Sequence, residues 1–110
     1  MIMQGYDLEA AVPFIARAMR KAHREAQDAL EAFICRAIEA DMRYMHATGV
    51  LDGDGLMGDG EYDDDDAFEA LLDALSVGVT DEHEIDRIAQ LLDSYMAAQQ
   101  DYLEDSGLME

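Results

Sequence analysis

Apolar side chains recur every third or fourth residue over most of the first half of the chain. They are Ile15, Met19, Ala22, Ala26, Leu30, Phe33, Ile34, Ile38, Met42 and Met45. This spacing lines one face of an α-helix. Pro13 suits the first turn of a helix, where its missing N–H is not needed, and Thr48-Gly49 suits a helix end. We therefore predict one long helix over about residues 12–48, roughly 50 Å in length.

Two shorter stretches repeat the same pattern in the second half. The first contains Phe68, Leu71, Leu72 and Leu75, and the second contains Ile85, Ile88, Leu92, Tyr95, Met96, Tyr102 and Leu103. They predict a helix over about residues 64–77 and another over about 80–105, with Thr80 as the N-cap of the second. No stretch alternates as a strand would, and no internal repeat is present.

These patterns predict an all-α fold, a small helical bundle with one long N-terminal helix and two shorter helices. Residues 1–110 form a single helical domain, in which an acidic, glycine-rich loop over 49–63 joins the long helix to the next one. Two short helices are not long enough to cover the long one. It must project, kink or pack against a second copy, and we expect a homodimer.

Several classes of protein are disfavoured by what the sequence lacks. The single cysteine, Cys35, cannot form an internal disulfide, and the first residues have no basic and apolar pattern of a signal peptide. The apolar runs are too short to span a membrane. The three histidines are far apart, and no catalytic or cofactor motif is present. We expect a cytoplasmic protein that is not an enzyme, needs no cofactor and does not contact a membrane.

The charge is distributed very unevenly along the chain. Residues 1–43 hold six of the seven Lys and Arg residues and have a net charge of −1. Residues 44–110 hold only Arg87 against nineteen acids, a net charge of −18. Adaptation to high salt would acidify the whole surface. The asymmetry instead favours an acidic binding face.

Half of the residues in the stretch LDGDGLMGDGEYDDDD, which spans 51–66, are acids, and none is basic. One or two of Asp63, Asp64, Asp65 and Asp66 are explained by helix chemistry, because aspartate caps helix N-termini and favours the first turn. Four in succession are more than a cap requires. Simple hydration of a flexible loop, calcium binding and imitation of a nucleic-acid backbone are the three interpretations.

A twelve-residue segment within this region, VLDGDGLMGDGE, resembles the calcium-binding loop of EF-hand proteins. Asp52, Asp54 and Glu61 fall at loop positions 3, 5 and 12, and Gly55 falls at position 6, which needs glycine. Val50 stands at position 1, where a carboxylate is needed. The resemblance implies a degenerate loop in which Asp52, Asp54 and Glu61 are weak candidate ligands, and we predict no metal site.

Imitation of nucleic acid explains the surplus charge best. DNA-binding proteins place Lys and Arg against the phosphate backbone, and carboxylates at a similar density can occupy the same basic groove. Tyr62 adds an aromatic anchor to the acids. The predicted partner-binding residues are Asp52, Asp54, Asp59, Glu61, Tyr62, Asp63, Asp64, Asp65, Asp66, Glu69, Asp73, Glu82, Asp86 and Asp93.

In size, helix content and charge, the chain resembles the small acidic phage-encoded inhibitors of the anti-CRISPR and antirestriction class, although it shares no quotable motif with them. The resemblance implies an inhibitor that blocks a basic nucleic-acid-binding protein, such as a CRISPR effector or a restriction enzyme, inside a prokaryotic host, without contacting nucleic acid itself. An acidic helical interaction or dimerisation module without mimicry, and an EF-hand-like calcium-binding protein, stay open as alternatives.

Overall fold

The computed structural model describes residues 6–21, 23, 27–52, 58, 60 and 62–106. Its helices are α1 (Leu8–Arg20), α2 (Gln27–Thr48), α3 (Asp64–Leu75) and α4 (Glu82–Asp105). The predicted all-α helical bundle is confirmed for this part of the chain, but the number and lengths of the helices differ from the prediction.

The single long helix predicted over residues 12–48 is wrong, because α1 ends at Arg20 and α2 begins at Gln27. Its predicted start is wrong as well. The Asp7 carboxylate accepts the Glu9 N–H at 3.0 Å and caps α1, so Pro13 lies inside the helix. A helix of about 50 Å would be longer than the molecule, whose greatest dimension is 37 Å. Two helices that pack against each other bury the described residues of that apolar face within one compact chain.

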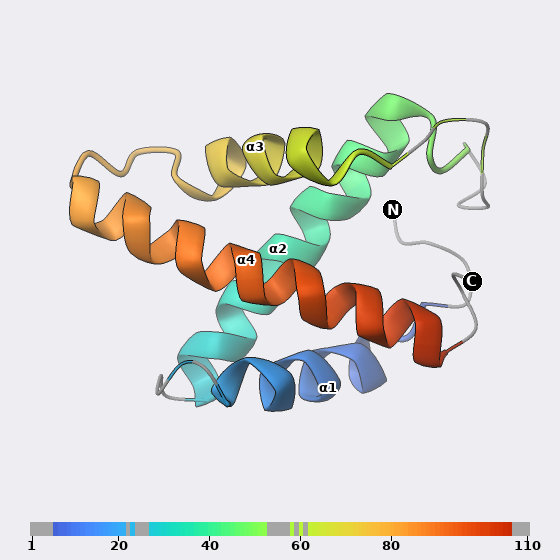
Figure 1. Cartoon of the computed structure of the whole chain (residues 1–110), viewed down its shortest axis with the longest axis horizontal. Helices are drawn as coiled ribbons and strands as arrows, with labels where there is room; N and C mark the ends of the chain where they lie inside the picture. Colours follow the sequence, from blue (N-terminus) through green and yellow to red (C-terminus); the bar gives the residue numbers. More distant parts are fainter. Residues whose placement is uncertain are drawn as a thin grey trace.

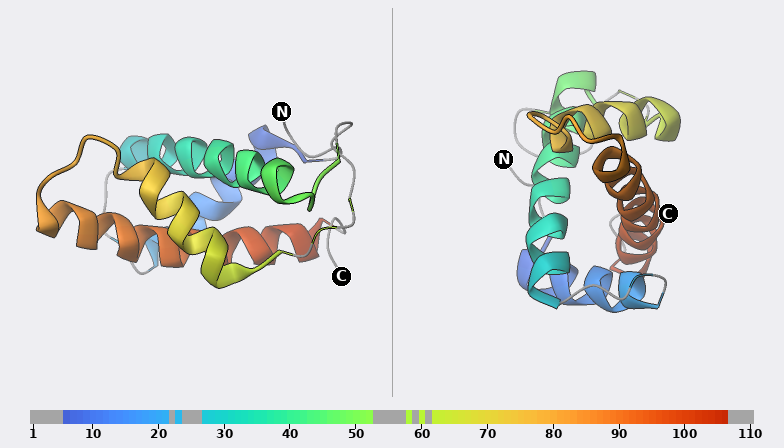
Figure 2. Two further views of the ribbon diagram at one scale, coloured as in Figure 1. Left: turned by 90° about the horizontal axis from the view of Figure 1, so that it is seen from above. Right: turned by 90° about the vertical axis from the view of Figure 1, so that its left-hand side faces the viewer.

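The helices surround a common core, with α1 and α3 on opposite sides of α4 (Figure 1). Both α2 and α4 contact α1 and also contact α3, whereas α1 and α3 do not contact each other. Viewed from the left-hand side of Figure 1, α3 lies above and α1 below, with α2 and α4 between them (Figure 2). This arrangement separates the charge of α1 from the charge of α3.

The core draws apolar side chains from every helix. Its largest fully buried members include Ile15, Met19, Leu30, Ile34, Ile38, Met42, Met45, Leu71, Leu92 and Tyr95. The apolar face predicted for the first half of the chain is therefore correct in its described residues, and the chain's own helices cover it. The uncovered surface from which we expected a homodimer is not present on these residues.

Side-chain caps fix where α3 and α4 begin. The Asp63 carboxylate accepts the N–H groups of Asp65 and Asp66 at 3.0 and 3.2 Å, so α3 starts at Asp64 as predicted. It ends at Leu75, two residues before the predicted end. The N-cap of α4 is Asp81 rather than Thr80, because the Asp81 carboxylate accepts the His83 N–H at 2.9 Å.

The chain after α2 turns back against the end of that helix. Gly49 has a φ of +79°, a conformation that favours glycine, and ends α2 where predicted. The Gly60 N–H donates to the Gly49 carbonyl at 2.9 Å. A Cβ on Gly60 would collide with the Thr48 carbonyl oxygen, so this close backbone approach requires glycine. The fold-back brings the chain to Tyr62 and to the start of α3.

Within the residues that the structure describes, no helix combines the length and the hydropathy needed to cross a bilayer.

Candidate functional site

Exposed carboxylates gather on α3, on its N-cap and on the first half of α4. We call these residues the acidic surface: Asp63, Asp64, Asp65, Asp66, Glu69, Asp73, Glu82, Asp86 and Asp93. Asp52, just after α2, is also exposed. The other predicted acids, Asp54, Asp59 and Glu61, lie outside the described residues.

The acidic surface carries no compensating cation in the described part of the chain. The ion pairs that join two described residues are Arg43–Glu39 at 2.9 Å and Arg87–Glu84 at 3.7 Å, and neither includes a residue of the acidic surface. Both pairs are exposed, so each is worth at most about 1 kcal/mol. The carboxylates of the acidic surface therefore face solvent without an ion pair to a described cation.

Three basic side chains gather on α1, on the far side of α4 from α3, whereas Arg36 and Arg43 on α2 lie beside the end of α3. Arg17 and Arg20 occupy the last turn of α1 and Lys21 caps it, a position that favours cations because of the helix dipole. The helix α1 is separated from α3 by α4 (Figure 1). A cluster of cations on α1 is thus separated from the larger acidic surface on α3 and α4, and Arg36 and Arg43 lie at one border of that surface.

Tyr62, predicted as an aromatic anchor for the partner, has an inward-facing hydroxyl. It is half-buried, and its hydroxyl donates to Asp41 Oδ1 at 2.8 Å. Its ring packs edge-on against Tyr44, with the ring centroids 5.7 Å apart. The Tyr44 hydroxyl donates to Asp66 Oδ2 at 2.9 Å, so Asp66 also has a structural contact. Both residues help to hold the start of α3 against α2.

A buried polar network, which the sequence analysis missed, lies behind Tyr62. Asp41 is only 2% exposed, and its second oxygen accepts a hydrogen bond from the Tyr95 hydroxyl at 3.1 Å. Gln99 Nε2 donates to the Tyr95 hydroxyl at 3.1 Å, and Gln99 Oε1 accepts from the Tyr6 hydroxyl at 2.6 Å. The network joins the N-terminal segment, α2, α4 and the segment before α3.

Burial controls the protonation of these groups. It raises the pKa of the Asp41 carboxyl, and the hydrogen bonds from Tyr62 and Tyr95 oppose that shift. Burial also raises the pKa of Tyr62 and Tyr95, and the Asp41 charge raises both further. Both phenols therefore stay protonated near neutral pH and act as hydrogen-bond donors to Asp41.

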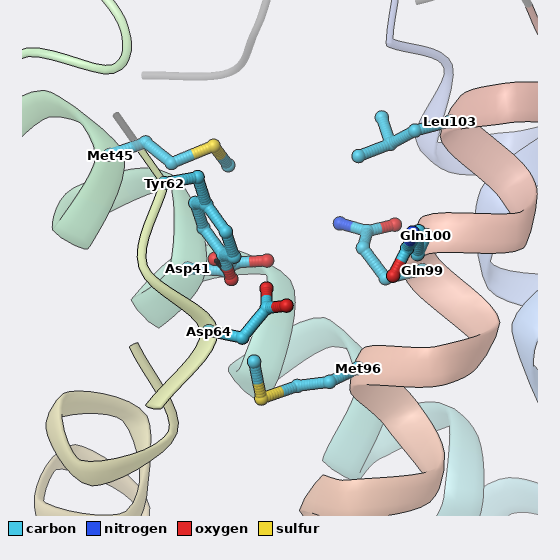
Figure 3. Close-up of a pocket in the computed structure, with 8 residues that line it drawn as sticks. All are labelled: Asp41, Met45, Tyr62, Asp64, Met96, Gln99, Gln100 and Leu103. Carbon is cyan, nitrogen blue, oxygen red and sulfur yellow. Dashed lines mark hydrogen bonds between the residues drawn. The ribbon is translucent and has the colours of Figure 1, made fainter. Parts of the chain in front are cut away.

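A cavity of about 210 Å³ lies next to this network (Figure 3). The second half of α2, the segment that follows it and the start of α3 form one wall, and α4 forms the other. Its lining residues are Asp41, Met45, Tyr62, Asp64, Met96, Gln99, Gln100 and Leu103. A more open groove adjoins it, sharing Asp64, Met96 and Gln100 and adding Asp65, Phe68, Asp93 and Ala97. The cavity thus lies beside the acidic surface.

The described residues contain no cluster of three or more His, Cys, Asp or Glu side chains that could hold a metal ion. Val50, at the first position of the EF-hand-like segment, is 1% exposed, and its carbonyl accepts the Gly58 N–H at 2.8 Å. This position therefore supplies an apolar core residue in place of a ligand. The other two candidate ligands, Asp54 and Glu61, are outside the described residues. A calcium titration tests all three together.

Addition of millimolar calcium should leave the melting temperature unchanged to within about 1 °C, because a loop without its first ligand gains little from the ion. Differential scanning calorimetry with calcium, with magnesium as a control for ionic screening, measures this. A rise that occurs with calcium alone and is reversed by EGTA would restore the calcium-binding alternative.

Comparisons of the chain with protein-family models, with curated proteins and with solved structures gave no match.

Proposed function

We propose that this protein is an inhibitor that binds a nucleic-acid-handling protein, and that its acidic surface occupies a Lys- and Arg-lined groove in place of the nucleic acid. The observation that supports this most is the set of nine exposed carboxylates on α3 and α4 that form no ion pair within the described residues. An uncompensated surface of this kind repels nucleic acid and attracts basic proteins.

The spacing of the acids suits this role. Asp65, Glu69 and Asp73 are four residues apart on α3, so they form a line with a rise of about 6 Å per carboxylate. One strand of duplex DNA carries a charge about every 3.4 Å of axis. A second line, formed by Glu82, Asp86 and Asp93, runs along α4. Two lines on packed helices approach the charge density that a basic groove is built to bind.

The rigidity of the surface favours binding further. These carboxylates project from two packed helices, and Asp63 fixes the start of α3 through its cap. A partner therefore meets charges whose backbone positions are already ordered, which lowers the entropy cost of binding. Long-range attraction should make association fast and strongly dependent on salt. Such inhibition needs no catalysis, since occupation of the groove excludes the nucleic acid.

CRISPR effectors and restriction enzymes are the partner classes that this proposal favours. A competition experiment tests it, with fluorescein-labelled duplex DNA bound to each member of a panel of purified effectors and restriction enzymes. We expect the protein to release the DNA from at least one member, with an apparent Kd below about 1 µM at low salt.

Poly-glutamate at the same concentration of charge is the control, and it should release much less DNA. If the protein binds a panel member while the DNA stays bound, the surface is an interaction module without mimicry. If it never releases more DNA than poly-glutamate does, the proposed function is wrong.

A further inference from the structure

The cavity beside Asp41 combines a buried charge with apolar walls. Asp41 and Asp64 are on one side of it, and Met96 and Leu103 are on the other (Figure 3). One water molecule takes up about 30 Å³ in the liquid, so 210 Å³ has room for a group of roughly five to seven non-hydrogen atoms. This size suits one side chain or one small organic ion.

No described Lys, Arg or His forms an ion pair with the Asp41 carboxylate. None of the described residues that line the cavity is Lys, Arg or His, and Asp41 is only 2% exposed. Its hydrogen bonds come from neutral groups, the phenols of Tyr62 and Tyr95 and the side-chain amide of Gln99. An ionised carboxylate has about four acceptor positions, and burial of its charge is costly without an opposite charge. The remaining acceptor capacity and the uncompensated charge both suit a cationic donor.

The exposed Asp64 carboxylate adds a second negative group to the same cavity. Calcium and magnesium require six or more oxygen ligands and bind poorly among methionine side chains. A primary ammonium requires only three acceptors, and it can end an alkyl chain that packs against Met45, Met96 and Leu103. The lining therefore matches a compact cation on an apolar stem.

We propose that this cavity binds a primary alkylammonium group and that, in the complex, a lysine side chain of the protein partner supplies it. The ammonium lies between Asp41 and Asp64, and the methylene stem lies along the methionines. The adjoining groove, which carries Asp65, Phe68 and Asp93, leaves room for the residues next to that lysine. Only the source of the ammonium rests on the proposed function. The binding of the group itself is a property of this chain alone.

Such a site would give the acidic surface a specificity that charge alone does not supply. Exposed carboxylates attract any basic surface, whereas a cavity of fixed size accepts one correctly placed lysine. The partner would then be a protein with a lysine that projects from its basic groove.

The probe for this site is n-butylammonium chloride, titrated into the whole protein while the ¹³C-methyl NMR signals of Met45 and Met96 are followed. We expect saturable shifts with a Kd of about 1 to 10 mM, as befits a ligand of five non-hydrogen atoms. Neutral 1-butanol and sodium chloride, at equal concentrations, should give much smaller shifts. If 1-butanol shifts these signals as far and with the same Kd, the cavity binds only the alkyl chain and the inference is wrong.

Two variants locate the charge that binds. Asp64→Asn should raise the Kd for butylammonium about threefold to tenfold. It should not disturb the fold, because Asp64 is exposed. Asp41→Asn should abolish saturable binding. Asp73→Asn removes one exposed charge that does not line the cavity, so its Kd should match that of the unmodified protein. If Asp41→Asn does not fold, Asp64→Asn decides alone, and an unchanged Kd overturns the site.

The two proposals fail separately. Absence of butylammonium binding, together with release of DNA from a panel member, removes the cavity site and keeps the proposed function. If butylammonium binds but no DNA is released, the cavity is an alkylammonium site, and the proposal that a lysine of a nucleic-acid-binding partner fills it is wrong.

Discussion

Replacement of Asp41 by alanine should lower the free energy of unfolding by about 2 to 4 kcal/mol at about pH 5. The Tyr62 and Tyr95 hydroxyls both donate to this carboxyl, and Tyr95 is fully buried. Without Asp41, each hydroxyl must find another acceptor or remain unsatisfied, and an unsatisfied buried polar group costs about 1 to 3 kcal/mol. The smaller alanine side chain also removes packing between α2 and α4.

The loss should be smaller at about pH 8. Burial raises the pKa of Asp41 in the folded protein above its ordinary value of 3.8. A carboxyl with a raised folded pKa contributes most to stability at low pH, and that contribution falls as pH rises through the folded pKa. As pH rises above the ordinary pKa, the unmodified protein bears a growing cost of keeping this carboxyl in the interior, which alanine removes. The two proteins should therefore differ less in stability at high pH.

Urea unfolding followed by circular dichroism measures the free energy of unfolding at each pH. Urea is preferred because it does not screen charges as guanidinium salts do. Asp41→Asn is the matched variant, since it keeps the shape and one acceptor oxygen but does not titrate. Asp73→Asn controls for net charge. A difference between Asp41→Ala and the unmodified protein that grows with pH would contradict the raised pKa. A loss below about 0.5 kcal/mol at both pH values would contradict the structural role of the network.

The position of Asp41 in the sequence did carry a signal for this network. Asp41 is three residues after Ile38 and four before Met45, so it lies on the apolar face predicted for this helix. Gln99 is likewise four residues after Tyr95 and four before Leu103. Polar residues on an apolar face need partners, and buried tyrosines need acceptors for their hydroxyls. The pattern indicates that a network exists, but only the packing of the helices decides which groups meet.

The break between α1 and α2 could not be predicted from periodicity. Ala22 and Ala26 continue the three-and-four spacing across it, and no Gly or Pro lies between Arg20 and Gln27. Local preference therefore favours one helix, whereas burial of the apolar face within a single chain requires two. Tertiary packing outweighs local helix preference here, as it commonly does.

Helix ends could be predicted from the sequence where they depend on one or two local residues. Thr48-Gly49 ends α2 through the positive φ of Gly49, and Asp63 caps α3 through two backbone N–H groups. The exposure of the residues of the acidic surface was also predictable, since unpaired carboxylates avoid the interior. The inward hydroxyl of Tyr62 was not predictable, because its acceptor, Asp41, lies on another helix.

Because the acidic surface lies on α3 and α4, charges can be removed from it or from other helices. Comparing the two tests whether the partner binds this surface or responds only to the net charge of the protein. The triple variant Asp65→Asn, Glu69→Gln and Asp73→Asn removes one line of carboxylates from α3, all of them exposed. Its affinity for the panel member from which the protein releases DNA should fall about 10-fold to 100-fold, at roughly 0.5 to 1 kcal/mol per charge. The loss should appear mainly in the association rate, and the dependence of affinity on salt should become shallower.

The variant should fold with nearly unchanged stability. Asp65 is in the first turn of α3, where the helix dipole favours an anion, and Asp73 is in the last turn, where it disfavours one, so the two effects oppose each other.

The matched control is the triple variant Glu9→Gln, Asp28→Asn and Glu31→Gln, because it removes the same formal charge from α1 and α2. Biolayer interferometry at several salt concentrations measures both triple variants. The control should lose less than about threefold in affinity, since its charges lie outside the acidic surface. Equal losses in the two variants would mean that the partner responds only to net charge, and the acidic surface would then have no role as a located binding site.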